Sequence, residues 1–179
     1  MYKRQGTYTS TAGLSINAGT GAVDVSASTA GTYTVTNTIV AANGCAQVTA
    51  TSSIVITTLP VATFSYTGTP YCSNDNDPSP TYGGAGVAGA FTTSGAVGAL
   101  SINAGTGAVD ISASTAGTYT VTNTIVAANG CVQVTATSSI VITTLPVATF
   151  SYTGTPYCSD DADPSPTYSG GGVAGAFTS

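Results

Sequence analysis

Apolar and polar residues alternate along most of this chain, and the pattern is clearest between residues 117 and 143. Tyr119, Val121 and Ile125 share one face of a predicted strand, threonines fill the other face, and Asn123 is a polar exception on the apolar face. A period of two residues is typical of a strand with one buried face. The return segment repeats it, with apolar residues at 132, 134, 136, 140 and 142. Asn129-Gly130 between them is the usual two-residue turn of a β-hairpin.

The same pattern occurs twice, because the chain is an internal repeat. The segment from Leu14 to Pro60 recurs from Leu100 to Pro146, an offset of 86 residues, and both copies continue into the letters VATFSYTGTPYCS. Such a period indicates tandem structural units. We therefore expect the later part of one unit over residues 6–60, a complete unit over 61–146, and the first part of a further unit over 147–179. Each boundary follows the letters TTLP, where a proline ends the strand pattern.

Within the complete unit, no segment of helical length places apolar residues at helical spacing. The pattern predicts strands over 61–66, 88–93, 100–103 and 108–112 before the hairpin, and a long loop over 70–86 that is rich in Pro, Asp, Asn, Ser and Gly. Short antiparallel strands at turn spacings of about ten residues are typical of an immunoglobulin-type β-sandwich. The predicted fold is all-β, with one complete and two partial sandwich repeats of 86 residues.

Residues 1–5, MYKRQ, do not match the repeat and hold both basic residues, Lys3 and Arg4. The codons GTG TAT AAG AGA CAG, which end a common transposon-based sequencing adapter, encode this pentapeptide when GTG is a start codon. We expect residues 1–5 to be an adapter artefact at the edge of a longer gene. The alternative is a genuine short N-terminus.

Composition excludes several classes of function. The acidic residues are seven aspartates, and there is no Glu, His or Trp. A repeat without Lys or Arg cannot neutralise phosphates, so no nucleic-acid partner is expected. General acid-base or nucleophilic catalysis lacks a His or Lys partner, so the chain is not expected to be an enzyme. No apolar run approaches the roughly 20 residues of a membrane-spanning helix, so no membrane span is expected. No cofactor is expected either.

Several motifs resemble a known class of protein. Gly117-Thr118-Tyr119, and the matching segment at Tyr33, look like the tyrosine corner of immunoglobulin-like domains, and LSINAGTGAVDIS is similar to a motif of bacterial putative-immunoglobulin and cadherin-like repeats. The whole unit resembles the tandem immunoglobulin-like repeats of giant surface adhesins from gliding bacteria that use type IX secretion. This resemblance implies an extracellular, cell-surface protein with a non-catalytic stalk or adhesive role. Its implied partners are neighbouring repeats of the same chain, and surface glycans or other cells.

Each unit of such an exported repeat carries two cysteines, and an even count indicates a disulfide. In the complete unit these are Cys72 and Cys131, and we predict a bond between them that closes a loop of about 60 residues. Free buried thiols are the main alternative. A metal site is the remaining one, although two sulfurs without His make a poor ligand set.

Two acidic loops, residues 73–78 and 159–164, are weak candidates for calcium sites, because clustered Asp and Asn oxygens suit that ion. The candidate ligands are Asp75, Asp77, Asp161 and Asp163. These loops lack a bidentate Glu and EF-hand spacing, and Asp, Asn, Ser and Pro are also ordinary turn formers.

Two other functions remain open at the level of sequence. The repeats themselves could bind glycan, with stacking surfaces from the tyrosines Tyr66, Tyr71, Tyr82 and Tyr119. Alternatively, residues 147–179 of one chain could supply the opening strands that residues 6–60 of the next chain lack. Head-to-tail completion of this kind builds a fibre.

Overall fold

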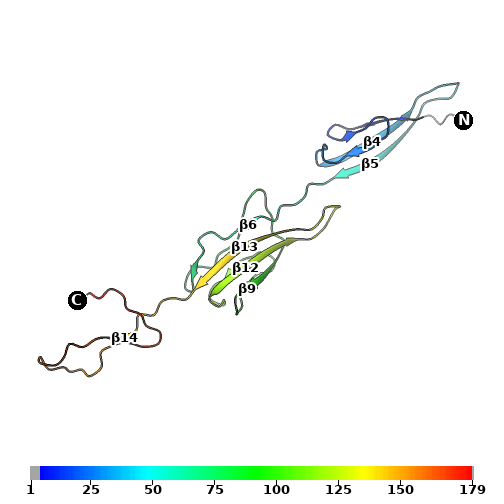
Figure 1. Ribbon diagram of the computed structural model, residues 1–179. Helices are drawn as coiled ribbons and strands as arrows, with labels where there is room; N and C mark the ends of the chain where they lie inside the picture. The colour runs from blue at the N-terminus through cyan, green and yellow to red at the C-terminus, as the bar shows by residue number, and fades with distance from the viewer. Residues whose placement is uncertain (1–4, 179) are drawn as a thin grey trace. The chain divides into compact units, whose positions relative to one another are not determined.

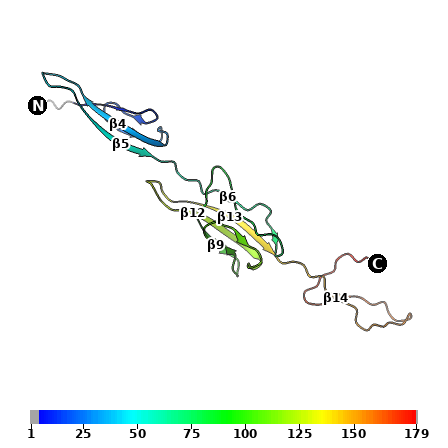
Figure 2. The same ribbon diagram turned by 180° about the vertical axis from the view of Figure 1, so that it is seen from behind.

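The structure is a computed structural model that describes residues 5–178; the pentapeptide MYKRQ therefore lies outside the described residues except for Gln5. Every regular element among the described residues is a β-strand (Figures 1 and 2). The predicted all-β class is confirmed. None of the described residues forms a helix that is long and apolar enough to cross a membrane.

Backbone contacts group the chain into two compact units. One holds the chain up to Val61 together with the hairpin tip Ile125–Val134, and the other holds Ala62–Thr124 and the chain from Thr135 onward. Each is described by itself below. The repeat boundaries at 60 and 146 stay a prediction.

The second unit contains a four-stranded sheet with the order β7-β13-β12-β9. The strands are β7 (Tyr71–Cys72), β9 (Ala90–Gly95), β12 (Gly117–Ile125) and β13 (Val134–Thr143). β9 pairs antiparallel with β12, whereas β7 pairs parallel with β13. At the turn between β12 and β13, Asn129 and Gly130 have φ values of 51° and 81°, which confirms the predicted hairpin turn.

Two short strand pairs form a second layer against this sheet. They are β6 (Phe64–Ser65) with β8 (Thr81–Tyr82), and β10 (Ser101–Ile102) with β11 (Val109–Asp110). Apolar side chains from both layers form one core: Phe64, Tyr66, Tyr71, Phe91, Leu100, Val109, Ile111, Tyr119, Val121, Ile140 and Ile142. Tyr119 and Val121 of β12, and Ile140 and Ile142 of β13, thus reach the core that the alternating pattern predicts. Val132, which was expected on the same face, lies ahead of β13 and is 68% exposed.

The long loop predicted over residues 70–86 is not strandless, because it contains β7 and β8. Each of these strands has only two residues, which is too short for alternation to be visible in the sequence. β7 is also specified by a partner far along the chain, since Tyr71 lies opposite Ile142 and Cys72 opposite Thr143. Only the folded chain brings these residues together.

Asn123, the polar exception on β12, is completely buried. Its Oδ1 accepts a hydrogen bond from the Gly89 amide at 2.7 Å, and its Nδ2 donates to the carbonyls of Ala62 and Val87 at 2.9 Å each. Buried backbone groups need such partners. The side chain therefore fixes the segments that enter and leave the second layer.

The first unit repeats the later strands of this fold. Its strands are β1 (Thr7–Ser10), β2 (Ser15–Ile16), β3 (Val23–Asp24), β4 (Gly31–Ile39) and β5 (Val48–Ile56). The sheet order β1-β4-β5 corresponds to β9-β12-β13, and the β2-β3 pair corresponds to β10-β11. Among the described residues of this unit, no strands correspond to β6, β7 and β8.

The chain after Thr143 contains one further strand pair, β14 (Phe150–Ser151) with β15 (Thr167–Tyr168). Its register is that of β6 with β8, because Phe150 lies opposite Tyr168 as Phe64 lies opposite Tyr82. The β14-β15 pair is therefore a second copy of the β6-β8 pair, which belongs to the first part of the complete repeat.

Candidate functional site

The strongest candidate for a functional feature is the junction between the first part of the complete repeat and its last strand. The parallel ladder of β7 with β13 places Tyr71 and Cys72 beside Ile142 and Thr143. Since β7 opens the sheet and β13 closes it, this ladder joins the two ends of the repeat.

Four hydrogen bonds extend this ladder on both sides. The Ser73 amide donates to the Thr143 carbonyl at 2.9 Å, and the Thr143 hydroxyl donates to the Tyr71 carbonyl at 3.1 Å. The Val141 amide donates to Thr69 Oγ1 at 2.9 Å, and the Leu145 amide donates to Ser73 Oγ at 3.1 Å. We call the segments 69–73 and 141–145 with these bonds the terminal clamp.

The two tyrosines predicted as corner residues make equivalent contacts in the two units. The Tyr119 hydroxyl donates to the Thr115 carbonyl at 2.9 Å and lies 2.7 Å from Thr115 Oγ1. The Tyr33 hydroxyl makes both contacts with Thr29, each at 2.7 Å. A hydroxyl bonded to the backbone a few residues upstream is the contact that defines a tyrosine corner.

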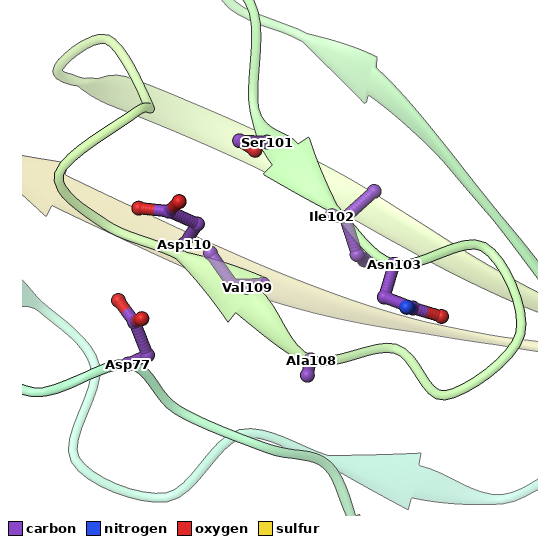
Figure 3. Close-up of a pocket in the computed structure, with 7 residues that line it drawn as sticks. All are labelled: Asp77, Ser101, Ile102, Asn103, Ala108, Val109 and Asp110. Atoms are coloured by element: carbon purple, nitrogen blue, oxygen red, sulfur yellow. The ribbon is translucent and has the colours of Figure 1, made fainter.

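An open pocket of about 350 Å³ lies between the acidic loop and the β10-β11 hairpin (Figure 3). Asp77 and Asp110 line it from opposite sides, together with residues of both short strands. Asp77 Oδ1 accepts a hydrogen bond from the Ile111 amide at 2.8 Å, and the Pro78 carbonyl accepts one from the Val109 amide at 3.0 Å. The acidic loop is thereby tied to the edge of β11.

The Asp110 side chain stabilises the turn that follows β11. Its Oδ1 accepts hydrogen bonds from the Ser112 hydroxyl at 2.8 Å and from the Ala113 amide at 2.9 Å. The Ser112 hydrogen bond, followed by that of Ala113, holds the pKa of this carboxyl below its ordinary value. Sequence reasoning missed Asp110 as a neighbour of Asp77, because the pocket joins residues that are far apart in the chain.

The other candidate calcium ligands lie in separate surroundings. Asp75 Oδ2 accepts from the Cys72 amide at 2.7 Å, and Asp161 Oδ2 makes the same contact with the Cys158 amide. Asp163 lies on an exposed stretch. Within residues 5–178 there is no group of three or more His, Cys, Asp and Glu side chains that could hold a metal ion. Calcium binding stays a prediction.

The predicted disulfide between Cys72 and Cys131 is not confirmed, since both are free thiols in this structure, and it stays a prediction. Cys72 lies beside Thr143 at the last residue of β13, whereas Cys131 precedes the first residue of that strand. Ten strand residues span about 30 Å, and a disulfide requires Cα atoms within about 7 Å. The Cys131 thiol instead donates to the Thr58 carbonyl at 3.5 Å and lies 3.1 Å from Thr57 Oγ1. Cys45 and Cys158 are free and exposed.

The predicted stacking tyrosines do not form a glycan platform. Tyr66, Tyr71 and Tyr119 are buried in the core, and only Tyr82 is partly accessible. Burial, with smaller contributions from Tyr82 and Tyr71, raises the pKa of Tyr66 to about 12. The Tyr66 hydroxyl donates to the Gly107 carbonyl at 2.6 Å. These rings stabilise the sandwich and present no face to a sugar.

Tyr8 is a half-buried residue whose equivalence to Phe91 the constant offset of the repeat does not reveal. It lies opposite Asn37 on β4 and its ring packs on Gly21, exactly as Phe91 lies opposite Asn123 and packs on Gly107. The loop after Tyr8 is three residues shorter than the loop after Phe91, so the constant offset of 86 does not align the two rings. The pattern Gly-x-aromatic-Thr, which precedes both loops, is the sequence signal that could have identified Tyr8 as the equivalent of Phe91.

Comparison with known proteins yields only distant likenesses of structure, one of which is described here. No protein-family model matches the chain, and no curated protein matches it. A SusE-like surface located polysaccharide binding protein from the Bacteroides thetaiotaomicron heparin utilisation locus is similar over 84% of this chain, with 19% sequence identity and a TM-score of 0.32. The similar part covers 31% of that protein.

Proposed function

We propose that this chain is a non-catalytic, load-bearing segment of an extracellular cell-surface protein, in which tandem repeats act as a stalk or adhesive spacer. The observation that carries the proposal is the terminal clamp. A repeat that sits in a tandem array receives force through its two ends, and here the first and last parts of the repeat are hydrogen-bonded to each other.

The direction of the strands determines how the clamp responds to force. β7 and β13 run parallel, so tension applied to the entry of β7 and the exit of β13 slides one strand along the other. All hydrogen bonds of the clamp then bear the load together, whereas an antiparallel pair pulled from one end would open one bond at a time. The clamp therefore stabilises the repeat against the load that a spacer carries.

Composition supports an extracellular setting for such a spacer. The repeat has a net negative charge, no basic residue and many threonines on the outer faces of its strands. β-branched residues suit a half-buried strand surface, and net charge favours solubility. The proposed partners are neighbouring repeats, with surface glycans or other cells as the targets of the adhesive protein.

Pulling single molecules of the full chain from both ends tests this proposal. Thr69→Val removes the acceptor of the Val141 amide and keeps the shape of the side chain, so we expect a lower unfolding force for the complete repeat. Thr120→Val makes the same chemical change at an exposed position of β12 and should leave the force unchanged. Equal unfolding forces in the two variants would contradict a load-bearing clamp.

A further inference from the structure

The four-stranded sheet of the complete repeat has an edge that is mostly uncovered. In the order β7-β13-β12-β9, the outer neighbour of β13 is β7. β7 pairs only with Ile142 and Thr143, at the far end of a strand of ten residues. Among the described residues, no strand therefore lies beside residues 134–140 on this side of β13.

The terminal clamp shows which backbone groups point to this edge. The Thr143 carbonyl and the Val141 amide both bond to the segment that contains β7. Backbone groups of alternate residues point to the same side of a strand, so those of Thr135, Thr137 and Ser139 point to this edge too. In the part of the chain that the structure describes, these groups bond to no neighbouring segment. Three consecutive pairs of donors and acceptors are thus left for another strand.

The sequence has none of the features that usually protect an open edge. Proteins block such edges with charged side chains, prolines or bulges. Residues 132–145 contain no charged residue and no proline, and the burial of side chains alternates regularly along β13. Most of these residues are Val, Thr, Ile or Ser, and the β-branched ones favour an extended strand. The edge is therefore a ready template for β-strand addition.

The segment that fits this edge best is its own sequence. When two copies of β13 run antiparallel with Thr137 on the two-fold axis, Thr135 faces Ser139 of the second copy and Ala136 faces Ser138. All five side chains are small or β-branched and none is charged, so the strands meet without steric clash or repulsion. None of the seven aspartates lies in β9, β12 or β13.

We propose that residues 135–139 of β13 pair antiparallel with the same residues of a second copy of this chain, which joins two sheets edge to edge. The contact is isologous, since both copies use the same surface. Each of the three outward-pointing residue pairs exchanges two backbone hydrogen bonds, about six in all. Cross-strand pairs of Thr with Ser on the outer face add to these. This association does not depend on the load-bearing role, because the terminal clamp forms within one copy.

A single contact of this kind is weak, and the repeat compensates by number. Five residues on each side are few beside the about 20–30 of a standard interface. The letters VTATSSI of residues 134–140 recur at residues 48–54 of β5, which ends the sheet order β1-β4-β5. Two such edges in one chain can act together or join more than two copies. Association should therefore be reversible, and salt should strengthen it by screening the net charge of −5.

The first test is sedimentation velocity of the full chain over a range of concentrations, with a reductant present because all four thiols are free. We expect a weight-average mass that rises above 17.4 kDa with concentration and salt. Thr51→Lys with Thr137→Lys places like charges opposite each other at both edges and should keep the chain monomeric. Thr34→Lys with Thr120→Lys adds the same charge at exposed positions of β4 and β12 and should associate like the original chain. A monomeric original chain at every concentration, or equal association of the two variants, would overturn the proposal.

The second test locates the contact on the backbone of the original chain. In amide hydrogen exchange by nuclear magnetic resonance, the amides of Thr135, Thr137 and Ser139 should exchange at least about tenfold more slowly in a concentrated sample than in a dilute one. The Val141 amide is already bound to Thr69 Oγ1 and serves as the internal control that should not change. Unchanged exchange at residues 135, 137 and 139 while the mass rises would place the contact on another surface and contradict pairing at this edge.

Discussion

Two asparagines with the same local sequence have different tasks in this molecule. Asn123 lies in a closed core and binds three backbone groups, whereas Asn37 faces a gap with an unpaired Oδ1. Residues 62–87 supply the two carbonyls that Asn123 Nδ2 binds, and the described part of the first unit contains no counterpart of this segment. At this scale the surroundings decide whether a polar residue in an apolar row stabilises the fold.

Asn123→Ala should strongly destabilise the complete repeat, because it leaves the Gly89 amide and the Ala62 and Val87 carbonyls without a partner. At about 1–3 kcal/mol for each unpaired buried group, we expect a loss of at least about 3 kcal/mol in the free energy of unfolding, measured by urea denaturation with near-ultraviolet circular dichroism. Asn37→Ala is the matched control and should change stability far less. Equal losses in the free energy of unfolding would show that the hydrogen bonds between Asn123 and the segment 62–89 do not stabilise the complete repeat.

The Tyr66 hydroxyl makes the stability of the complete repeat depend on pH in the alkaline range. Its pKa is about 12 in the folded chain because of burial, and about 10 in an unfolded chain. Between these values the unfolded chain has released the proton and the folded chain has kept it, so the stability present below pH 10 should fall as pH rises toward 12.

Tyr66→Phe should flatten this loss of stability in denaturation curves recorded between pH 9 and pH 12. It should also lower stability at neutral pH by about 1 kcal/mol, because the Gly107 carbonyl loses its partner. Tyr152→Phe, in the C-terminal segment, is the control. If the stability of the Tyr66 variant fell with pH as steeply as that of the control, the assignment of this pH dependence to Tyr66 would be contradicted.

At the scale of elements, the long strands could be predicted from the sequence and the short ones could not. Alternation over nine or ten residues identified β12 and β13 and their Asn-Gly turn. β7 and β8 have two residues each and exist because of partners elsewhere in the chain. The terminal clamp and the Asp77 pocket depend on such partners, so alternation along the sequence could not predict them.

The acidic loop acts as a brace between elements in this account, through Asp77 and the Ile111 amide. Asp77→Ala should therefore destabilise the complete repeat by about 1–3 kcal/mol in urea denaturation, without added calcium. Asp163→Ala is a closely matched control, since Asp163 occupies the same position of the repeat on an exposed stretch. An Asp77 variant as stable as the Asp163 variant in calcium-free buffer would contradict the brace.

At the scale of the whole molecule, one sequence of 86 residues is present in complete and partial forms. The complete form buries its aromatic rings, and the partial forms leave an open face at residues 6–60 and exposed rings at Phe150 and Tyr152. The sequence predicted the repeat and its period. It could not predict Tyr8 as a substitute for Phe91, because a shortened loop shifts the alignment.

The most direct test of this account is amide hydrogen exchange by nuclear magnetic resonance on the full chain. In the complete repeat, the amides of Val109 and Ile111 are bound to Pro78 and Asp77 and lie in a closed core. Their counterparts Val23 and Val25 lack that loop. We expect Val109 and Ile111 to exchange at least about a hundredfold more slowly than Val23 and Val25, which corresponds to roughly 2.7 kcal/mol or more of extra protection. Equal exchange rates at the paired positions would show that residues 62–88 do not complete the fold, and would contradict the account.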